Sequence, residues 1–398
     1  MKIQHMKNLN LSNKKILIRS DLNVPITPNG KIISDIRIRY ALPTINMALQ
    51  QKAKVMVTSH LGSPEEGIYN AHYSLKPIVQ WLKHNISNKY TIHFKKNYLN
   101  EPLQLNNGEL TILENVRFNK GEKNNTLSLS KKYASLCDIF IMDAFGAAHR
   151  KHSSTYGIIK FAPISCIGPL LYKEIKNLHQ ITKNPKKPII AIIGGAKIST
   201  KLNILHFLSN IVDKLIVGGG IANTMLAAKG YNIGKSLQEI DAIKEAKKLI
   251  KKNNIITPID VIVNNENEKQ DKKITQKFIH DIQDYEKILD IGKHSITQIT
   301  NIIKHAKTII WNGPIGAFEL EKFQEGTKKL CQAIATSNAF SIVGGGDTIA
   351  AVEKFKISEK ISYISTGGGA FLKFLTKGTL PAIQAIKNTT QKYNTSMI

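Results

Sequence analysis

The sequence predicts an α/β protein made of two domains, each built on a parallel β-sheet. Three observations support this class. The chain has 398 residues, enough for two domains that each bury a core. Short apolar runs rich in β-branched residues recur along it, separated by segments long enough for helices. The runs in the two halves end in different residue types, so we expect the halves to bind different ligands.

The first half contains four predicted strands that end in polar residues. These runs lie within residues 14–23, 53–62, 109–118 and 137–146. Parallel sheets bind ligands at the carboxyl ends of their strands, so the polar side chains there should line one binding edge. They are Arg19, Asp21, Asn23, His60, Asn115, Arg117 and Asp143.

Arginine is confined to the same half. Lysine and arginine together number 56, and the only five arginines are at positions 19, 37, 39, 117 and 150. A guanidinium group is planar and binds carboxylate or phosphate through two nitrogens, which lysine cannot do. We therefore expect a small ligand with two or three negative charges at this edge. Arg19 could instead pair with Asp21, and a structural ion pair is the preferred interpretation of Arg39.

The second half contains five predicted strands that end in glycine, within residues 188–197, 214–223, 307–316, 339–348 and 361–370. Glycine lets backbone N–H groups approach a phosphate closely, and several such loops together indicate a phosphate-binding edge. Asp347 could hold Mg²⁺, and the Thr348 hydroxyl could meet a phosphate. Lys197 and Lys201, four residues apart, are expected on one face of a helix that begins just after the first glycine loop.

Two common nucleotide-binding signatures are missing from the sequence. It contains neither G-x-x-x-x-G-K-[ST] nor a G-x-G-x-x-G that opens a helix. Residues 168–183 have helical spacing and are followed by Pro185, which stops a helix. We expect this helix to connect the halves, with the domain boundary near residue 187.

The net charge of +27 is the extreme feature of the composition. The lysines are dispersed among many Asn and Ile residues, as an AT-rich coding sequence would produce, so we expect at most weak, nonspecific attraction for polyanions and no specific nucleic-acid partner. No apolar run approaches the ~20 residues of a membrane helix, and no signal peptide is recognisable. The three cysteines, Cys137, Cys166 and Cys331, show no metal or redox spacing. A cytoplasmic location without membrane attachment is expected.

Ten motifs in order resemble phosphoglycerate kinase: RSDLNVP, SDIRI, SHLG, LENVRFNKGE, DAFGAAHRKHSS, GGAKISTK, GGGIANT, WNGPIGAFE, GGGDT and STGGGA. The resemblance extends from about residue 4 to residue 385, and its loop lengths are similar to the bacterial type. It implies two Rossmann-like domains joined by a helix, with a hinge and a cleft between them. Residues 1–170 would bind 3-phosphoglycerate, 171–187 would form the connecting helix, 188–377 would bind Mg-nucleotide, and 378–398 would pack back on the first domain.

The resemblance also implies roles for individual residues. The phosphoglycerate site would consist of Asp21, Asn23, Arg37, His60, Leu61, Gly62, Arg117 and Arg150. The nucleotide site would consist of Gly194, Gly195, Lys197, Lys201, Gly218, Gly219, Asn312, Glu319, Gly344, Gly345, Gly346, Asp347 and Thr348. Arg37, Lys201, Gly345 and Gly346 would be catalytic, and Asp347 would bind the metal.

The activity implied is reversible phosphoryl transfer between 1,3-bisphosphoglycerate and ADP, which gives 3-phosphoglycerate and ATP. Mg²⁺ with ATP or ADP would be the cofactor, and the chain would act as a monomer. Because the attacking group is an ionised oxygen, no general base is needed, and catalysis reduces to positioning and charge neutralisation. The alternative is a non-catalytic nucleotide- or polyanion-binding relative. The presence of Arg37, Lys201 and Asp347 argues against it.

The sequence departs from the family pattern at three positions. Ser63 stands where the family usually has the arginine of SHLGRP, Lys373 where it tends to have glutamate, and Ala147 where threonine is common. Serine carries no charge, so the first departure predicts weaker binding of phosphoglycerate. The other two are expected to be tolerated.

Overall fold

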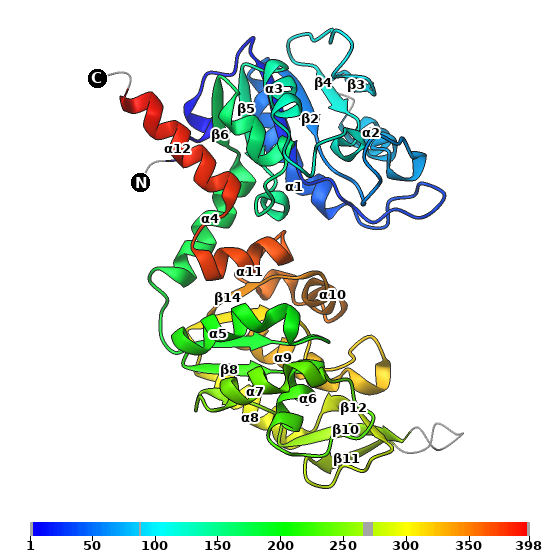
Figure 1. Cartoon of the computed structure of the whole chain (residues 1–398), viewed down its shortest axis with the longest axis vertical. Coiled ribbons are helices and arrows are strands. Elements are labelled where there is room, and N and C mark those ends of the chain that lie inside the picture. Colours follow the sequence, from blue (N-terminus) through cyan, green and yellow to red (C-terminus); the bar gives the residue numbers. More distant parts are fainter. Residues whose placement is uncertain (1–2, 87–88, 266–273, 396–398) are drawn as a thin grey trace. The chain divides into compact units, whose positions relative to one another are not determined.

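The computed structural model describes residues 3–86, 89–265 and 274–395, which form two compact units (Figure 1). The first unit contains the described residues up to Lys176 and those from Thr379 onward; the second is Asn177–Gly378. The division falls inside helix α4 (Pro169–Thr182), which lies where the sequence predicts a connecting helix. Pro169 suits the first helical position, because the N–H that proline lacks would have no partner there.

The first unit is built on a parallel sheet, as predicted, and the sheet has six strands where four were expected. Its strands in spatial order are β3 (Ile92–Lys95), β4 (Leu110–Leu113), β2 (Lys54–Thr58), β1 (Lys15–Ser20), β5 (Ile139–Asp143) and β6 (Ile164–Ile167). The edge strands β3 and β6 were not predicted. Each is only four residues long, so its apolar run is short, and β3 buries only one residue.

Alternate residues of the central strands explain why helices pack on this sheet. Ile16 and Ile18 of β1 belong to one core with α1 (Ile36–Gln50) and α2 (Lys76–Ile86). Leu17 lies on the other face and is also buried, so β1 needs a continuous apolar run rather than an alternating one. Each fully buried isoleucine or leucine contributes about 1.5–3 kcal/mol. Helix α3 (Leu127–Ser135) belongs to the same unit.

Helix α12 (Pro381–Thr395) brings the C-terminal part of the chain back to the first unit (Figure 1). It contacts β6, and the N–H of Ala382 donates to the carbonyl oxygen of Ala148 at 3.2 Å. The last three residues of the expected segment 378–398 lie outside the described residues.

The second unit contains another parallel sheet, as predicted, with one strand (β9) more than the five expected. Its strands in spatial order are β15 (Tyr363–Ile364), β14 (Phe340–Val343), β13 (Thr308–Asn312), β7 (Ile189–Ile193), β8 (Lys214–Val217) and β9 (Ile255–Ile256). The helices of this unit are α5 (Leu202–Ile211), α6 (Gly219–Ala228), α7 (Ile243–Ile250), α8 (Lys293–Lys304), α9 (Glu325–Thr336), α10 (Gly346–Lys354) and α11 (Gly368–Lys377).

A separate antiparallel sheet in the second unit was not predicted. It consists of β11 (Ile274–Phe278), β10 (Asp260–Asn265) and β12 (Glu286–Ile291). No residue of β11 is buried, and Gln276 and Lys277 interrupt its apolar pattern. A strand that covers little core lacks the pattern by which strands are recognised.

In each parallel sheet, the earlier strands of the unit lie on one side of a central reversal point and the later strands on the other. In the first unit the reversal lies between β1 and β5, and in the second between β7 and β13. Ligands of open α/β sheets bind at such reversals, beyond the carboxyl ends of the strands. The two predicted binding edges lie at these positions.

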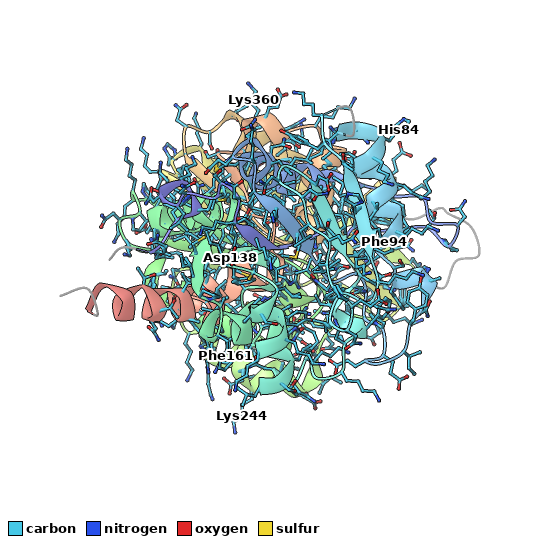
Figure 2. The ribbon with its side chains drawn as sticks, turned by 90° about the horizontal axis from the view of Figure 1, so that it is seen from above. His84, Phe94, Asp138, Phe161, Lys244 and Lys360 are labelled. Atoms are coloured by element: carbon cyan, nitrogen blue, oxygen red, sulfur yellow. The ribbon has the colours of Figure 1, made fainter. Side chains whose placement is uncertain are left out.

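The charged surface consists largely of lysines that extend into solvent. Lys244 of α7 and Lys360 are examples in the second unit; both are exposed and point outward (Figure 2). Within the described ranges, no helix combines the length and apolar character needed to cross a membrane.

Candidate functional site

In the first unit, the exits of β1 and β2 are held together by predicted site residues. Arg37, in the first turn of α1, donates from Nη1 to Oδ1 of Asp21 at 3.0 Å. The carboxylate is almost fully buried, whereas a third of the Arg37 side chain is exposed. Asn23 Oδ1 accepts from the backbone N–H of Gly62 at 2.8 Å. The structure therefore brings these residues of the predicted phosphoglycerate site together.

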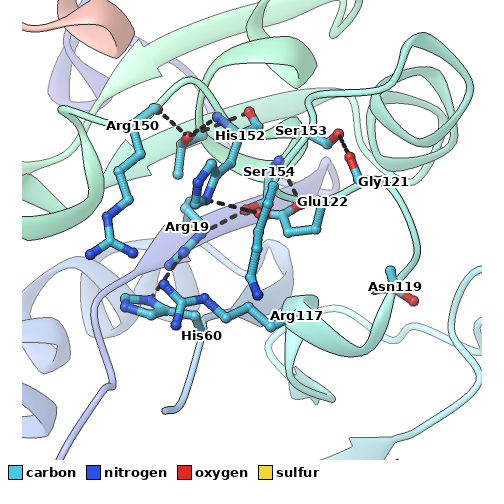
Figure 3. Close-up of polar contacts among 12 residues, drawn as sticks. Arg19, His60, Arg117, Asn119, Gly121, Glu122, Arg150, His152, Ser153 and Ser154 are labelled. Carbon is cyan, nitrogen blue, oxygen red and sulfur yellow. Dashed lines mark hydrogen bonds and ion pairs between the residues drawn. The ribbon is translucent and has the colours of Figure 1, made fainter. Parts of the chain in front are cut away.

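Arg19 determines the protonation of His60. Arg19 is buried, and its Nη2 lies 3.2 Å from Nδ1 of His60 (Figure 3). Because arginine can only donate, Nδ1 must accept, and the proton of the neutral ring then resides on Nε2. Burial, and then the charges of Arg19, Arg117, Arg150 and Arg37, lower the pKa of His60 well below its usual value. His60 is thus a neutral ring with one N–H available to an anion.

The alternative pairing of Arg19 with Asp21 is wrong. The guanidinium donates to Ser154 Oγ at 3.0 Å, to the carbonyl oxygen of Ser20 and to His60. Ser154 in turn connects Arg19 to the fully buried carboxylate of Glu122, to which its hydroxyl donates at 2.6 Å. Burial raises the pKa of Glu122 to about 7, while the Ser154 hydrogen bonds and Arg19 oppose the shift.

Glu122 and Ser154 were not singled out from the sequence, although both lie within motifs quoted above. Figure 3 shows them beside Arg19, where the buried carboxylate of Glu122 supplies negative charge. A buried charge needs such a partner. The role of Glu122 becomes apparent only from its tertiary contact with Arg19 through Ser154.

The remaining arginines have different environments. Arg117 Nη1 donates to the carbonyl oxygen of Gly62 and to Ser63 Oγ, the latter at 2.7 Å. Arg150 Nε donates to Nε2 of His149 at 3.4 Å, and its charge affects the pKa of both His60 and Arg117. Arg39 forms two 2.9 Å hydrogen bonds to Asp35 on the surface, which confirms its interpretation as a structural ion pair.

Three residues that the sequence placed at this edge have side chains that contact the protein rather than an open ligand site. Asn115 Nδ2 donates to the carbonyl oxygen of Leu61 at 2.7 Å, and Asp143 accepts from the N–H of Leu171 at 2.8 Å. The Leu61 side chain is buried, so only its backbone can reach a ligand. What remains open is a cluster of cationic groups suited to a small, multiply charged anion.

The glycine edge of the second unit borders a cavity of about 310 Å³. Four predicted nucleotide residues line it: Gly195, Gly219, Glu319 and Asp347. Its walls are largely apolar, with Leu237, Val261, Ile288 and Leu289 among the lining residues. Sequence reasoning missed this apolar wall, because Leu237 lies outside any strand or helix and the others belong to the unpredicted antiparallel sheet. An apolar slot beside glycine loops suits a flat ring attached to phosphates.

Backbone geometry explains two of the glycines. The N–H of Gly194, after β7, donates to the carbonyl oxygen of Asn312, the last residue of β13, at 3.1 Å. A Cβ at Gly194 would lie 1.7 Å from the carbonyl oxygen of Pro314. Gly345 has φ +105°, a conformation that L side chains rarely adopt.

Several other predicted nucleotide residues hold the glycine loops in place through contacts within the loops. Asn312 Nδ2 donates to the carbonyl oxygen of Gly344, and the buried Thr348 hydroxyl accepts from the N–H of Gly313 at 2.7 Å. Side chains at Gly218 and Gly344 would collide with Ile315 and Phe371. The Thr348 hydroxyl also donates to the carbonyl oxygen of Gly344 at 3.0 Å, so it lies in the loop rather than on its open side.

Lys201 is anchored on the loops that leave β7 and β13. Its Nζ donates to the carbonyl oxygens of Gly194 at 2.7 Å and Asn312 at 3.2 Å. Burial lowers the pKa of Lys201 to about 8, and the charge of Asp347 opposes this shift. The expectation that Lys197 shares a helical face with Lys201 is wrong. Lys197 is exposed and precedes any helix, because α5 starts only at Leu202 after a short 3₁₀ turn.

The first turn of α10 completes this edge. Helix α10 begins at Gly346, where a Cβ would meet open space, and Asp347 is exposed beside the cavity. The first N–H groups of a helix have no acceptor within it and attract anions. Within the described part of the chain, no cluster of three or more His, Cys, Asp or Glu residues could hold a metal ion. A metal at Asp347 would therefore need further ligands from a bound nucleotide.

Comparison with known proteins agrees with this arrangement. The family model for phosphoglycerate kinase matches residues 6–378. The structure of phosphoglycerate kinase from Coxiella burnetii is 47% identical in sequence, with a TM-score of 0.89 over 98% of this chain and 100% of that one. Phosphoglycerate kinase from Pyrococcus horikoshii OT3 is 31% identical, with a TM-score of 0.83 and the same coverage of both chains. This chain has two parallel sheets, one with an arginine edge and one with a glycine edge. Together with the full-length similarities, they show that the chain belongs to the phosphoglycerate kinase family.

Proposed function

We propose that the chain catalyses reversible phosphoryl transfer between 1,3-bisphosphoglycerate and ADP with the two edges described above. The arginine edge of the first unit would bind phosphoglycerate, and the glycine edge of the second would bind Mg-nucleotide. The single observation with the greatest weight is the group of four arginines whose charges act on one neutral histidine, His60. A small dianion or trianion is the ligand that balances such a group.

Phosphoglycerate would be bound by several kinds of donor. Arg37, Arg117 and Arg150 would supply charge, and His60 would supply the N–H on Nε2. Asp21 and Asn23 would act mainly by fixing Arg37 and the Gly62 loop, which is supported by their hydrogen bonds at 3.0 and 2.8 Å. Leu61 and Gly62 would contribute backbone atoms.

The nucleotide would place its ring against the apolar wall of the cavity and its phosphates against the glycine loops. Gly195, Gly345 and Gly346 would offer backbone N–H groups, and Glu319 would reach the ribose hydroxyls. Gly219 would line the cavity only, because its N–H donates to the carbonyl oxygen of Ile315 at 3.1 Å. Gly194, Gly218, Gly344, Asn312 and Thr348 would hold these loops in shape. Lys197 is exposed, so it would contact the phosphates from the solvent side.

Mg²⁺ fits Asp347 because this metal often takes only one or two protein carboxylates, with phosphates and water completing its coordination. Bound there, it would neutralise charge on the nucleotide phosphates. The residues of the chain have the remaining tasks. Arg37 and Lys201 would stabilise charge on the transferring phosphoryl group, and the N–H groups of Gly345 and Gly346 would orient it.

The cellular setting is also proposed. Cys137, Cys166 and Cys331 are buried free thiols, in keeping with a reducing cytoplasm. The resemblance implies a monomer that acts on small molecules, without a specific nucleic-acid or membrane partner.

The test is a coupled assay with purified protein, ATP, Mg²⁺ and 3-phosphoglycerate. We expect turnover that depends on all three components and stops when a chelator removes Mg²⁺. The non-catalytic alternative predicts that the protein binds MgADP in a calorimeter yet forms no product. Binding without turnover under these conditions would refute the proposed activity.

A further inference from the structure

Ser63 contacts one of the proposed phosphoglycerate residues. Ser63 is an exposed residue, and its hydroxyl accepts a hydrogen bond from Nη1 of Arg117 at 2.7 Å. The same nitrogen donates to the carbonyl oxygen of Gly62. The sequence pattern alone indicates only a missing charge at this position, whereas the contact gives the serine a partner.

The loop that contains Ser63 is held by contacts independent of this side chain. On one side, the N–H of Gly62 donates to Asn23 at 2.8 Å. On the other, the carboxylate of Glu66 accepts from the N–H of Gly121 at 2.9 Å. The Ser63 hydroxyl is therefore a fixed acceptor, and its removal should leave the loop in place.

The two contacts on Nη1 leave one edge of Arg117 for a ligand. Nη1 lies on the Cδ side of the guanidinium, so the opposite edge is formed by Nε and Nη2. Among the residues described, Nη2 has no hydrogen-bond partner, and Nε is buried without one. A buried N–H without a partner is costly. Two parallel N–H groups on one edge match the two oxygens of a carboxylate or phosphate.

Arg117 also needs to be held against its neighbours. The like charges of Arg19 and Arg150 lie close enough to affect its ionisation. A guanidinium that was not anchored would be repelled by them. The acceptors on Gly62 and Ser63 counter this repulsion.

We propose that Ser63 is a positioning residue for the anionic substrate. With the carbonyl oxygen of Gly62, it fixes Nη1 and so presents the Nε–Nη2 edge of Arg117 to a carboxylate or phosphate group. The proposal rests on the proposed function, in which Arg117 binds phosphoglycerate.

Kinetics of three variants test this role. Ser63→Ala should raise the KM for 3-phosphoglycerate ~3- to 10-fold, because a partly exposed hydrogen bond to a charged group is lost. The kcat, the KM for ATP and the thermal unfolding midpoint should not change. Ser63→Thr keeps a hydroxyl and should restore the KM to within about twofold of wild type. Ser135→Ala, at an exposed serine of α3 whose hydroxyl bonds to Lys132, is the matched control and should change neither KM.

The Nε–H signals of the arginines, measured by NMR spectroscopy, test the contact directly. The chain has only five arginines, so the Nε–H signals are few, and Arg117→Lys identifies the one that belongs to Arg117. Ser63→Ala should shift that signal and weaken its response to 3-phosphoglycerate. An unchanged KM together with an unchanged Nε–H signal would overturn the proposal. Absence of turnover in the wild type would instead refute the proposed function, and the signal would still report on the contact.

Discussion

Arg37 and Lys201 are the two cations that we place beside the transferring group, and each has a distinct anchor. Arg37 is held by Asp21, and Lys201 by the carbonyl oxygens of Gly194 and Asn312. If both stabilise charge that develops during transfer, alanine at either position should lower kcat by ~100-fold or more, about 3 kcal/mol. The KM values should change little.

Steady-state kinetics with both substrates check this prediction. Arg39→Ala is a suitable control, because Arg39 forms an exposed ion pair with Asp35 only two residues from Arg37. It should leave kcat unchanged. A tenfold rise in KM with an unaltered kcat in the Arg37 or Lys201 variant would assign these residues to ground-state binding instead.

The pKa of Lys201 predicts how activity depends on pH. Burial lowers this pKa to about 8, and the cation is the form present below it. The rate that depends on the cation should therefore be lost as pH rises through about 8. Lys201→Arg remains charged because arginine titrates far above this range, so its rate, though lower, should stay level.

Profiles of kcat/KM for ATP between pH 6.5 and 9.5 distinguish the two proteins. The wild type should show a falling limb near pH 8 that the arginine variant lacks. The same falling limb in both would mean that another group titrates.

At the level of secondary-structure elements, the glycine loops after β7, β13 and β14 pack directly on one another. Gly194→Ala would force a methyl group against the carbonyl oxygen of Pro314, 1.7 Å from its Cβ position. The loops after β7 and β13 would have to separate, and we expect the free energy of unfolding to fall by about 1–3 kcal/mol or more.

Gly346→Ala is the matched comparison, because a Cβ there meets open space at the start of α10. It should leave the stability within ~0.5 kcal/mol of wild type. Calorimetric unfolding of the two variants measures the difference. Equal stabilities would show that the loops can adjust to a side chain at Gly194.

For the whole molecule, the net charge of +27 predicts a general attraction for nucleic acids. The lysines are dispersed, and examples such as Lys244 and Lys360 extend separately into solvent. Binding should therefore weaken steeply with salt and be equal for unrelated sequences. Fluorescence anisotropy with several oligonucleotides at two or more salt concentrations measures both properties. Tight binding to one defined sequence at physiological salt would contradict this account.

The sequence by itself determined the fold class, the two parallel sheets and the character of their edges. A strand buried on both faces must be a continuous apolar run, and that run must end where the chain reaches solvent. Arginines follow such ends in the first half and glycines in the second, so local patterns were enough to predict both edges. Strand β11 of the antiparallel sheet could not be recognised, because it buries none of its residues.

The tertiary structure alone decided how side chains at those edges are used. The Arg19–Ser154 hydrogen bond joins residues 135 positions apart, and the Lys201–Asn312 contact joins residues 111 apart. No local sequence pattern around Ser154, or around a backbone carbonyl, predicts such a long-range hydrogen bond. The same holds for Ser63, which the sequence presents as a lost charge and the structure presents as the acceptor for Arg117. Patterns repeat over a few residues because strands and helices do, whereas the partner of a side chain depends on how distant segments pack.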